Sequence, residues 1–217
     1  MVQAADKTVA LGEAQFRREA AHALSTPLGG LLLQAELADH YLRKGKTIPA
    51  QDALGALLRD FESFGQRFRS VFSAMADIAE DGENGSDPRE CVAEALVELG
   101  EEAVQVDYRG PSPHVAIPPR ALCALMRRLV LLAAASGASD ATLIVTVSGD
   151  DCILSLTGSG ANIDEHALPF DSPSGLHYCV AREIAARHGG RFGIGTATGA
   201  IAVVVLPMVH EGADAPS

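Results

Sequence analysis

The residues of this sequence that are most capable of chemistry are grouped around one histidine, His22, within a stretch of helical pattern. A histidine imidazole is mostly neutral near pH 7 and can act as a nucleophile toward a phosphoryl group. Arg18 lies four residues before His22 and Thr26 four residues after it, so a helix places all three on one face. The guanidinium of Arg18 can bind phosphate oxygens, and the hydroxyl of Thr26 can steady a phosphoryl group or orient a water molecule. These three residues are therefore the candidate site, with His22 as the acceptor.

A proline follows directly after Thr26 and interrupts the helical pattern. Proline inside a helix costs about 3 kcal/mol, because it lacks the amide N–H and crowds the preceding turn. We expect Pro27 to kink the helix and to let the His22 side chain swing outward. His40 lies on the same face about five turns later, but no Thr-Pro pair follows it, and we interpret it as a surface residue.

Two long amphipathic helices must position this site. Apolar residues recur at helical spacing from Leu11 to about Lys44, and again from about Pro49 to Ile78. Two such helices joined by a short loop form an antiparallel hairpin, which cannot bury its apolar stripes alone. We expect a second copy to cover them in a symmetric four-helix bundle, and packing on the chain's own C-terminal part is the alternative. The predicted stripes are Leu24, Leu28, Leu31, Leu32, Ala35 and Leu42 on the first helix, and Leu54, Leu57, Leu58, Phe61, Phe64, Phe68, Val71 and Phe72 on the second.

An acidic stretch rich in glycine, 80–88, predicts a linker before a second domain. Alternating helix and strand patterns follow, and they predict an α/β sandwich with helices on one face of a sheet, so the whole chain is of the α+β class. We place the hairpin domain at 10–80, the sandwich domain at 87–209 and a flexible tail at 211–217. The expected helices are 89–101, which Asp87 caps and Pro88 opens, 119–135 and 174–188. The expected strands are 104–108, 115–117, 141–148, 152–157, 191–195 and 200–207.

The composition narrows the class of partner. With 47% hydrophobic and 21% charged residues, the chain can bury a core. A net charge of -11 argues against nucleic acid and anionic membranes as partners. We see neither a membrane-spanning apolar run nor a signal peptide, and we expect a cytoplasmic protein. The four cysteines form no C-x-x-C pair, which indicates reduced thiols and no metal site.

Residues 22–28, H-A-L-S-T-P-L, resemble the phosphoacceptor segment of sensor histidine kinases, whose usual form is H-E-L-R-T-P-L. Residues 182–192, R-E-I-A-A-R-H-G-G-R-F, resemble the closing helix and strand of that family's ATP-binding domain. The resemblance extends over about residues 11–208, and it implies a dimerisation hairpin followed by an ATP-binding-type domain. The matched positions of the phosphoacceptor segment are His22, Leu24, Thr26, Pro27 and Leu28.

The residues by which that family binds ATP are absent at four positions. Leu132 stands where an asparagine would hold magnesium, and Leu156 stands where an aspartate would bind adenine. A leucine offers no oxygen ligand and accepts no hydrogen bond. In the second glycine box, P-S-G-L-H-Y, Pro173 and His177 replace glycines, and the lid loop at 162–171 is short. We therefore expect no nucleotide site, no cofactor and no metal, although Gly158, Gly160, Gly175 and Leu176 match the family.

A further departure lies beside the histidine, where Ala23 replaces the acidic residue that acts as a base in the kinases. The resemblance then implies a dimeric, kinase-like histidine phosphotransferase that relays phosphoryl groups between receiver-domain aspartates through His22. Its partners would be response-regulator receiver domains and an upstream hybrid kinase. Three alternatives stay open: a non-catalytic adaptor that binds a response regulator or a kinase, a phosphatase in which Thr26 positions water, and a kinase with an unusual nucleotide pocket. The adaptor differs from the relay in that His22 is dispensable.

Overall fold

The computed structural model describes residues 2–78, 85–99, 104–159, 170, 172–194 and 200–209. These residues divide into two compact units, one of residues 14–74 and one of the residues before 14 together with those from Met75 onward. Several predicted features lie wholly or mostly outside the described residues: the linker at 80–88, Gly160, the lid at 162–171 and the tail at 211–217.

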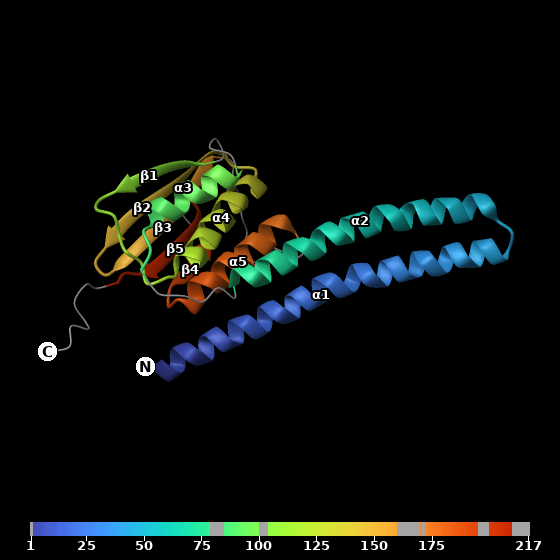
Figure 1. The fold of residues 1–217 in the computed structure, drawn as a ribbon, viewed down its shortest axis with the longest axis horizontal. Coiled ribbons are helices and arrows are strands. Elements are labelled where there is room, and N and C mark those ends of the chain that lie inside the picture. Colours follow the sequence, from blue (N-terminus) through green and yellow to red (C-terminus); the bar gives the residue numbers. More distant parts are fainter. Residues whose placement is uncertain are drawn as a thin grey trace. The chain divides into compact units, whose positions relative to one another are not determined.

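The first unit is a hairpin of two long helices that run antiparallel (Figure 1). Helix α1 spans Val2–Arg43 and α2 spans Thr47–Ile78. Gly45 makes the turn with a positive φ of 70°, which glycine adopts without steric cost. Helix α1 begins nine residues before the predicted Leu11, because residues 2–10 contain neither glycine nor proline to stop it.

The buried surface of the hairpin is a narrow seam of mostly small side chains, and much of the predicted stripes lies outside it. Leu31 is buried, whereas Leu28, Leu32 and Leu42 are exposed. A second apolar stripe on α2 is also exposed, and its members are separated by three, four or seven residues, which places them on one side of the helix. The buried seam consists of Phe16, Ala20, Ala23, Leu31 and Ala38 on α1 and Ala50, Ala53, Val71 and Ala74 on α2, and the exposed α2 stripe consists of Leu54, Leu58, Phe61, Phe68 and Phe72.

The second unit is a five-stranded sheet with three helices on one face, joined by the last turn of α2 (Figure 1). The strand order is β1-β2-β3-β5-β4, in which β1 pairs parallel to β2 and the other pairs are antiparallel. Two N-terminal helices followed by a helix-covered sheet confirm the predicted α+β class. The elements of this unit are α3 (Pro88–Leu99), β1 (Gln105–Arg109), α4 (Pro119–Ala135), β2 (Ser139–Ser148), β3 (Asp151–Ser159), α5 (Pro173–Arg187), β4 (Arg191–Ile194) and β5 (Ala200–Pro207).

Local signals explain the starts of two of these helices. The carboxylate of Asp87 accepts a hydrogen bond from the Arg89 amide at 2.8 Å, which is the predicted cap of α3. The Ser172 hydroxyl accepts from the Gly175 amide at 3.0 Å and caps α5. The strand predicted at 115–117 is wrong, because Val115 forms only isolated bridges, to Ser86 and Met208. Prolines at 113 and 118 flank this segment, and proline cannot donate to a ladder.

The core of the second unit lies between α4 and the covered face of the sheet. Alternate residues of the strands point into it, as expected for a sheet that is packed on one side. Three of the four cysteines are buried, and all four are free thiols. Within the described residues, no helix combines the length and the apolar character that a bilayer crossing requires. The largest fully buried side chains include Leu122, Leu125, Leu129, Leu132, Leu143, Leu154, Leu156 and Leu206.

We predict that Gly190→Ala destabilises the second unit by about 1–3 kcal/mol, the usual cost of overpacking. A Cβ at Gly190 would lie 2.6 Å from the Val205 carbonyl oxygen and 3.1 Å from the Ala185 carbonyl oxygen, both of them backbone atoms that cannot turn away. Chemical denaturation followed by circular dichroism measures the loss. Gly193→Ala is the matched control, since a Cβ at that position meets nothing within 4 Å. An equal free energy of unfolding for the two variants would contradict the packing argument.

Candidate functional site

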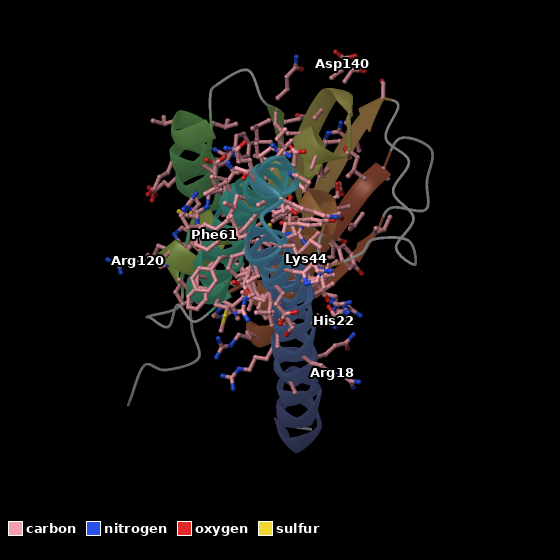
Figure 2. All side chains as sticks on the ribbon, turned by 90° about the vertical axis from the view of Figure 1, so that its right-hand side faces the viewer. Arg18, His22, Lys44, Phe61, Arg120 and Asp140 are labelled. Atoms are coloured by element: carbon pink, nitrogen blue, oxygen red, sulfur yellow. The ribbon has the colours of Figure 1, made fainter. Side chains whose placement is uncertain are left out.

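The histidine of the candidate site lies exposed on α1, together with the predicted arginine. Figure 2 shows Arg18 and His22 on the same side of this helix, and both residues are exposed. Thr26 is also exposed, one turn further along. Ala23 points the other way and is only 6% exposed, within the buried seam. The spacing in the sequence therefore gave the shared face correctly, and a docked partner can reach all three side chains.

Two hydroxyls bond to the helix backbone around the proline, while α1 runs without interruption through Pro27. Because Pro27 has no N–H, the Ala23 carbonyl lacks its usual partner four residues later. Thr26 donates its hydroxyl proton to the His22 carbonyl at 3.2 Å, and Ser25 donates to the Ala21 carbonyl at 2.5 Å. Hydroxyls bonded in this way often bend a helix. The Thr26 side chain is exposed, and its hydroxyl proton is held by the backbone next to His22.

The competing histidine, His40, has an environment unlike that of a reactive group. It is exposed near the C-terminal end of α1, and its ring contacts the ring of Tyr41 edge-on with centroids 6.0 Å apart. No hydroxyl-proline pair follows it in the sequence. We retain the interpretation of His40 as a surface residue.

In the second unit, apolar side chains occupy the positions that matter for a nucleotide. Leu132 on α4 is 0% exposed and Leu156 on β3 is 1% exposed, so both belong to the core. Leu156 pairs in register with Leu143 and Ala202 on the neighbouring strands. In the part of the chain that the structure describes, no group of three or more acidic, histidine or cysteine side chains is arranged to hold a metal ion.

Gly158, one of the glycines that match the family, is explained by packing. A Cβ at Gly158 would lie 2.9 Å from the Cβ of Ala138 and 3.2 Å from the Cδ1 of Ile201. The C-terminal end of β3, which is the central strand of the sheet, is thus too crowded for a side chain at this position. The presence of Gly158 therefore requires no bound nucleotide.

A buried ion cluster lies near Leu132, and the sequence alone did not reveal which residues form it. Arg128, one turn before Leu132 on α4, is 4% exposed, and Asp77 in the last turn of α2 is 8% exposed. Arg128 Nε lies 2.9 Å from Asp77 Oδ2, and Arg127 Nη2 lies 2.5 Å from Asp77 Oδ1. The one relevant signal in the sequence was the pair Arg127 and Arg128 within a mostly apolar stretch, which indicates that a buried arginine there needs an anionic partner. Some 50 residues separate Asp77 from them, so no local rule connects the pair.

The histidine of the second glycine box joins the same cluster. Nη1 of Arg128 lies 3.3 Å from Nδ1 of His177. Since a guanidinium only donates hydrogen bonds, Nδ1 must be the acceptor, and the proton of the neutral ring is then on Nε2. Burial, and next the positive charge of Arg128, lower the pKa of His177 from 6.5 to about 4. A neutral His177 thus contacts Arg128 at a position where the resemblance to sensor histidine kinases implies a glycine that makes room for phosphate.

The residues present therefore do not fit ATP and magnesium. The two ligand positions are buried leucines, and the side chain of His177 is held against Arg128. Magnesium requires oxygen ligands, and an adenine amino group requires a hydrogen-bond acceptor, and Leu132 and Leu156 offer neither. No chemical step at this unit is assigned to a nucleotide.

No family model matches the chain, and no curated protein matches it. Among solved structures, the Acinetobacter baumannii histidine kinase AdeS matches with a TM-score of 0.55 at 16% identity, over 87% of this chain and 98% of that one. The histidine kinase domain of the E. coli osmosensor EnvZ matches at 16% identity with a TM-score of 0.47, over 64% of this chain and 96% of that one. The ATP binding domain of PrrB from Mycobacterium tuberculosis matches at 18% identity with a TM-score of 0.48, over 60% of this chain and all of that one. At such identities the likeness to AdeS shows the fold alone, which is histidine-kinase-like.

The depressed pKa of His177 predicts a loss of stability in mild acid. As the pH falls below 6.5, the unfolded chain protonates this histidine first, because the folded protein resists protonation until about pH 4. The stabilisation is therefore present above pH 6.5 and is lost as the pH approaches 4. After allowance for partial solvent access we expect a loss of about 2–3 kcal/mol.

The measurement is urea denaturation across this pH range for the wild-type protein and for His177→Gln, which keeps an acceptor for Arg128 but does not titrate. Carboxylates titrate in the same range in both proteins, so the difference between the two curves isolates the histidine. If the free energy of unfolding depended on pH in the same way in both proteins, the lowered pKa of His177 would be contradicted.

Proposed function

We propose that this protein is a histidine phosphotransferase that relays phosphoryl groups between receiver-domain aspartates through His22, as a dimer in a two-component phosphorelay, and that it does so without binding ATP. The observation that carries the proposal is a contrast within one histidine-kinase-like fold. The hairpin keeps an exposed histidine beside an arginine and a Thr-Pro pair, while the second unit has buried leucines at its nucleotide positions. Such a protein has an acceptor for phosphate and no donor of its own.

The chemistry needs few groups from this chain. A ring nitrogen of His22 attacks the phosphorus of a receiver's aspartyl phosphate in line, forming a P–N bond as the P–O bond to the carboxylate breaks. The imidazole loses a proton to solvent, and the aspartate leaves as a carboxylate. The reverse reaction on a second receiver regenerates the neutral histidine. The resemblance implies that each receiver supplies its own magnesium and lysine.

Arg18 and Thr26 are assigned supporting roles in this relay. Arg18 lies one turn before His22 on the same face, where its guanidinium can bind the equatorial oxygens of the phosphoryl group. The hydroxyl of Thr26 donates to the His22 carbonyl, so its oxygen can accept a hydrogen bond from a water or from a receiver side chain. Loss of either group slows the transfer, whereas loss of His22 abolishes it.

The exposed apolar surface of the hairpin supports the dimer. Of the fourteen large hydrophobic side chains that are exposed in the described part of the chain, eleven lie between Leu28 and Phe72. Phe61, labelled in Figure 2, is 61% exposed, and Phe68 and Phe72 stack on each other with centroids 4.3 Å apart. A contiguous apolar stripe with three- and four-residue spacing matches what another helix pair covers in a four-helix bundle. A second copy brings an equal stripe.

The first prediction tests phosphotransfer. Receiver domains from the same genome, labelled with phosphate on aspartate, are mixed with the wild-type protein, with His22→Ala and with His40→Ala. We expect base-stable, acid-labile label on the wild-type protein and on His40→Ala, and none on His22→Ala. ATP offered without a receiver should leave no label on any of the three. Arg18→Ala and Thr26→Val should label more slowly, by roughly tenfold, the scale of one lost charge-assisted hydrogen bond.

The opposite results are equally informative. If receivers bind the protein tightly but transfer no label, and bind His22→Ala just as well, the relay is wrong and the adaptor function replaces it. If ATP alone labels His22, the protein is a kinase and the argument from Leu132 and Leu156 fails.

A second prediction concerns the dimer. The substitution Phe68→Glu places a charge in the proposed bundle core, where it has no partner. We expect this variant to sediment as a single chain of 22.6 kDa, whereas the wild-type protein should sediment at twice that mass. Gln66→Glu is the matched control, because it adds the same charge at an exposed site two residues away on α2 and should stay dimeric. A wild-type protein that sediments as a single chain would contradict the proposed bundle.

A further inference from the structure

Three arginines converge on the last turn of α2 within the second unit. Both carboxylate oxygens of Asp77 are bound, Oδ1 by Arg127 and Oδ2 by Arg128. A third arginine, Arg187 of α5, donates to the backbone carbonyl of Ile78, which lies at the C-terminal end of α2. That end of a helix carries partial negative charge and attracts cations. Side chains of α4 and α5 thus hold this turn by its carboxylate and its terminal carbonyl.

The contacts of this cluster are those of an anion receptor. The guanidinium groups of Arg127 and Arg128 both bind the carboxylate of Asp77, and the neutral ring of His177 also contacts Arg128. A guanidinium as deeply buried as Arg128, at 4% exposure, requires an anionic partner, because an unpaired buried charge is strongly destabilising. In this chain Asp77 is that partner.

The cluster is also open to small molecules from one side. A cavity of about 270 Å³ borders it and is lined in part by Asp77 and Arg127. Arg120, which is exposed and labelled in Figure 2, lines the same cavity one α4 heptad before Arg127 and adds a cation, whereas Glu94 adds an acid. A water molecule takes up about 30 Å³ in the liquid, so the cavity has room for a small carboxylate or phosphate beside the arginines. A free anion in this cavity can therefore contact Arg127, one of the two arginines that bind the Asp77 carboxylate.

We propose that Arg127 and Arg128 form an anion-binding site whose ligand in this protein is the carboxylate of Asp77, and that small carboxylates and inorganic phosphate bind there when this side chain is removed. Because Asp77 is held covalently beside the arginines, its effective concentration exceeds that of any free anion, and the wild-type site is closed to competitors. The last turn of α2 takes the place of a ligand in a fold whose nucleotide positions are lost. This inference is independent of His22 and goes beyond the proposed function.

The test is chemical rescue of Asp77→Ala. The midpoint of thermal unfolding is measured while acetate, and separately inorganic phosphate, is titrated against chloride at constant ionic strength. We expect the variant to unfold at a lower midpoint temperature than the wild-type protein. The added anion should restore at least half of this difference in midpoint temperature, with a saturable dependence on its concentration. The wild-type protein, titrated in parallel, shows the general effect of each salt on folded proteins.

Two further proteins keep the test decisive. The triple variant Asp77→Leu, Arg127→Met and Arg128→Met replaces the carboxylate and both guanidinium groups by apolar side chains, a change that buried ion pairs tolerate, and it should fold without responding to anions. Asp107→Ala removes an exposed carboxylate that pairs with Arg109 at 2.7 Å, and it should show no rescue either.

If Asp77→Ala is unfolded in chloride, the same titrations are read as recovery of helical circular dichroism. No saturable recovery with either anion, or an equal response in the triple variant, would overturn the proposal.

Discussion

The second unit depends on one requirement, that the apolar face of its sheet be covered without a gap. Helix α4 meets this requirement with leucines, and Leu132 and Leu156 from opposite sides of the interface are among the most deeply buried side chains of the protein. In a nucleotide-binding domain the same interface must admit polar ligands, which interrupt the core. Here the core is closed instead, and the buried Arg128 and Asp77 beside it are paired with each other. The packing that stabilises this unit also fills, with Leu132 and Leu156, the two positions where the resemblance to the kinases implies ligands of ATP and magnesium.

The proposed phosphoacceptor lies on the hairpin. The seam between α1 and α2 is made largely of alanines, so the two helices approach closely while larger side chains face outward. His22 is among the outward residues, next to Ala23, which faces inward. The hairpin thereby presents a nucleophile on a rigid helix, where a partner can approach it without any loop having to move. This arrangement suits a group that receives phosphate from an incoming protein.

The same geometry explains why the hairpin is incomplete by itself. A helix pair whose inner seam consists of small residues has room for few large ones, and its leucines and phenylalanines remain on the outside. Exposed apolar surface of this extent is costly in water. A second hairpin is the simplest cover, since it offers a matching stripe and closes the bundle by symmetry. The apolar pattern therefore bears on function as well as on stability.

The sequence by itself determined the elements with strong local signals. Helix α4 has its predicted bounds, because Pro119 opens a largely apolar run and Gly137 follows its end. The strands predicted at 141–148 and 152–157 form β2 and β3, and Gly149 between them has a positive φ of 61°. The shared face of Arg18, His22 and Thr26 followed from helical spacing alone. Local rules failed at 115–117, where flanking prolines prevent a ladder, and at the start of α1.

Only the tertiary structure decided which apolar residues are buried and which charges meet. Periodicity identified a stripe on each helix but could not divide it into an inner and an outer part, because both parts repeat at nearly the same spacing. The contact of Asp77 with Arg128 and of Arg128 with His177 joins residues about fifty positions apart. Such contacts depend on how helices pack across a core, and packing is a property of the folded chain rather than of any segment of it.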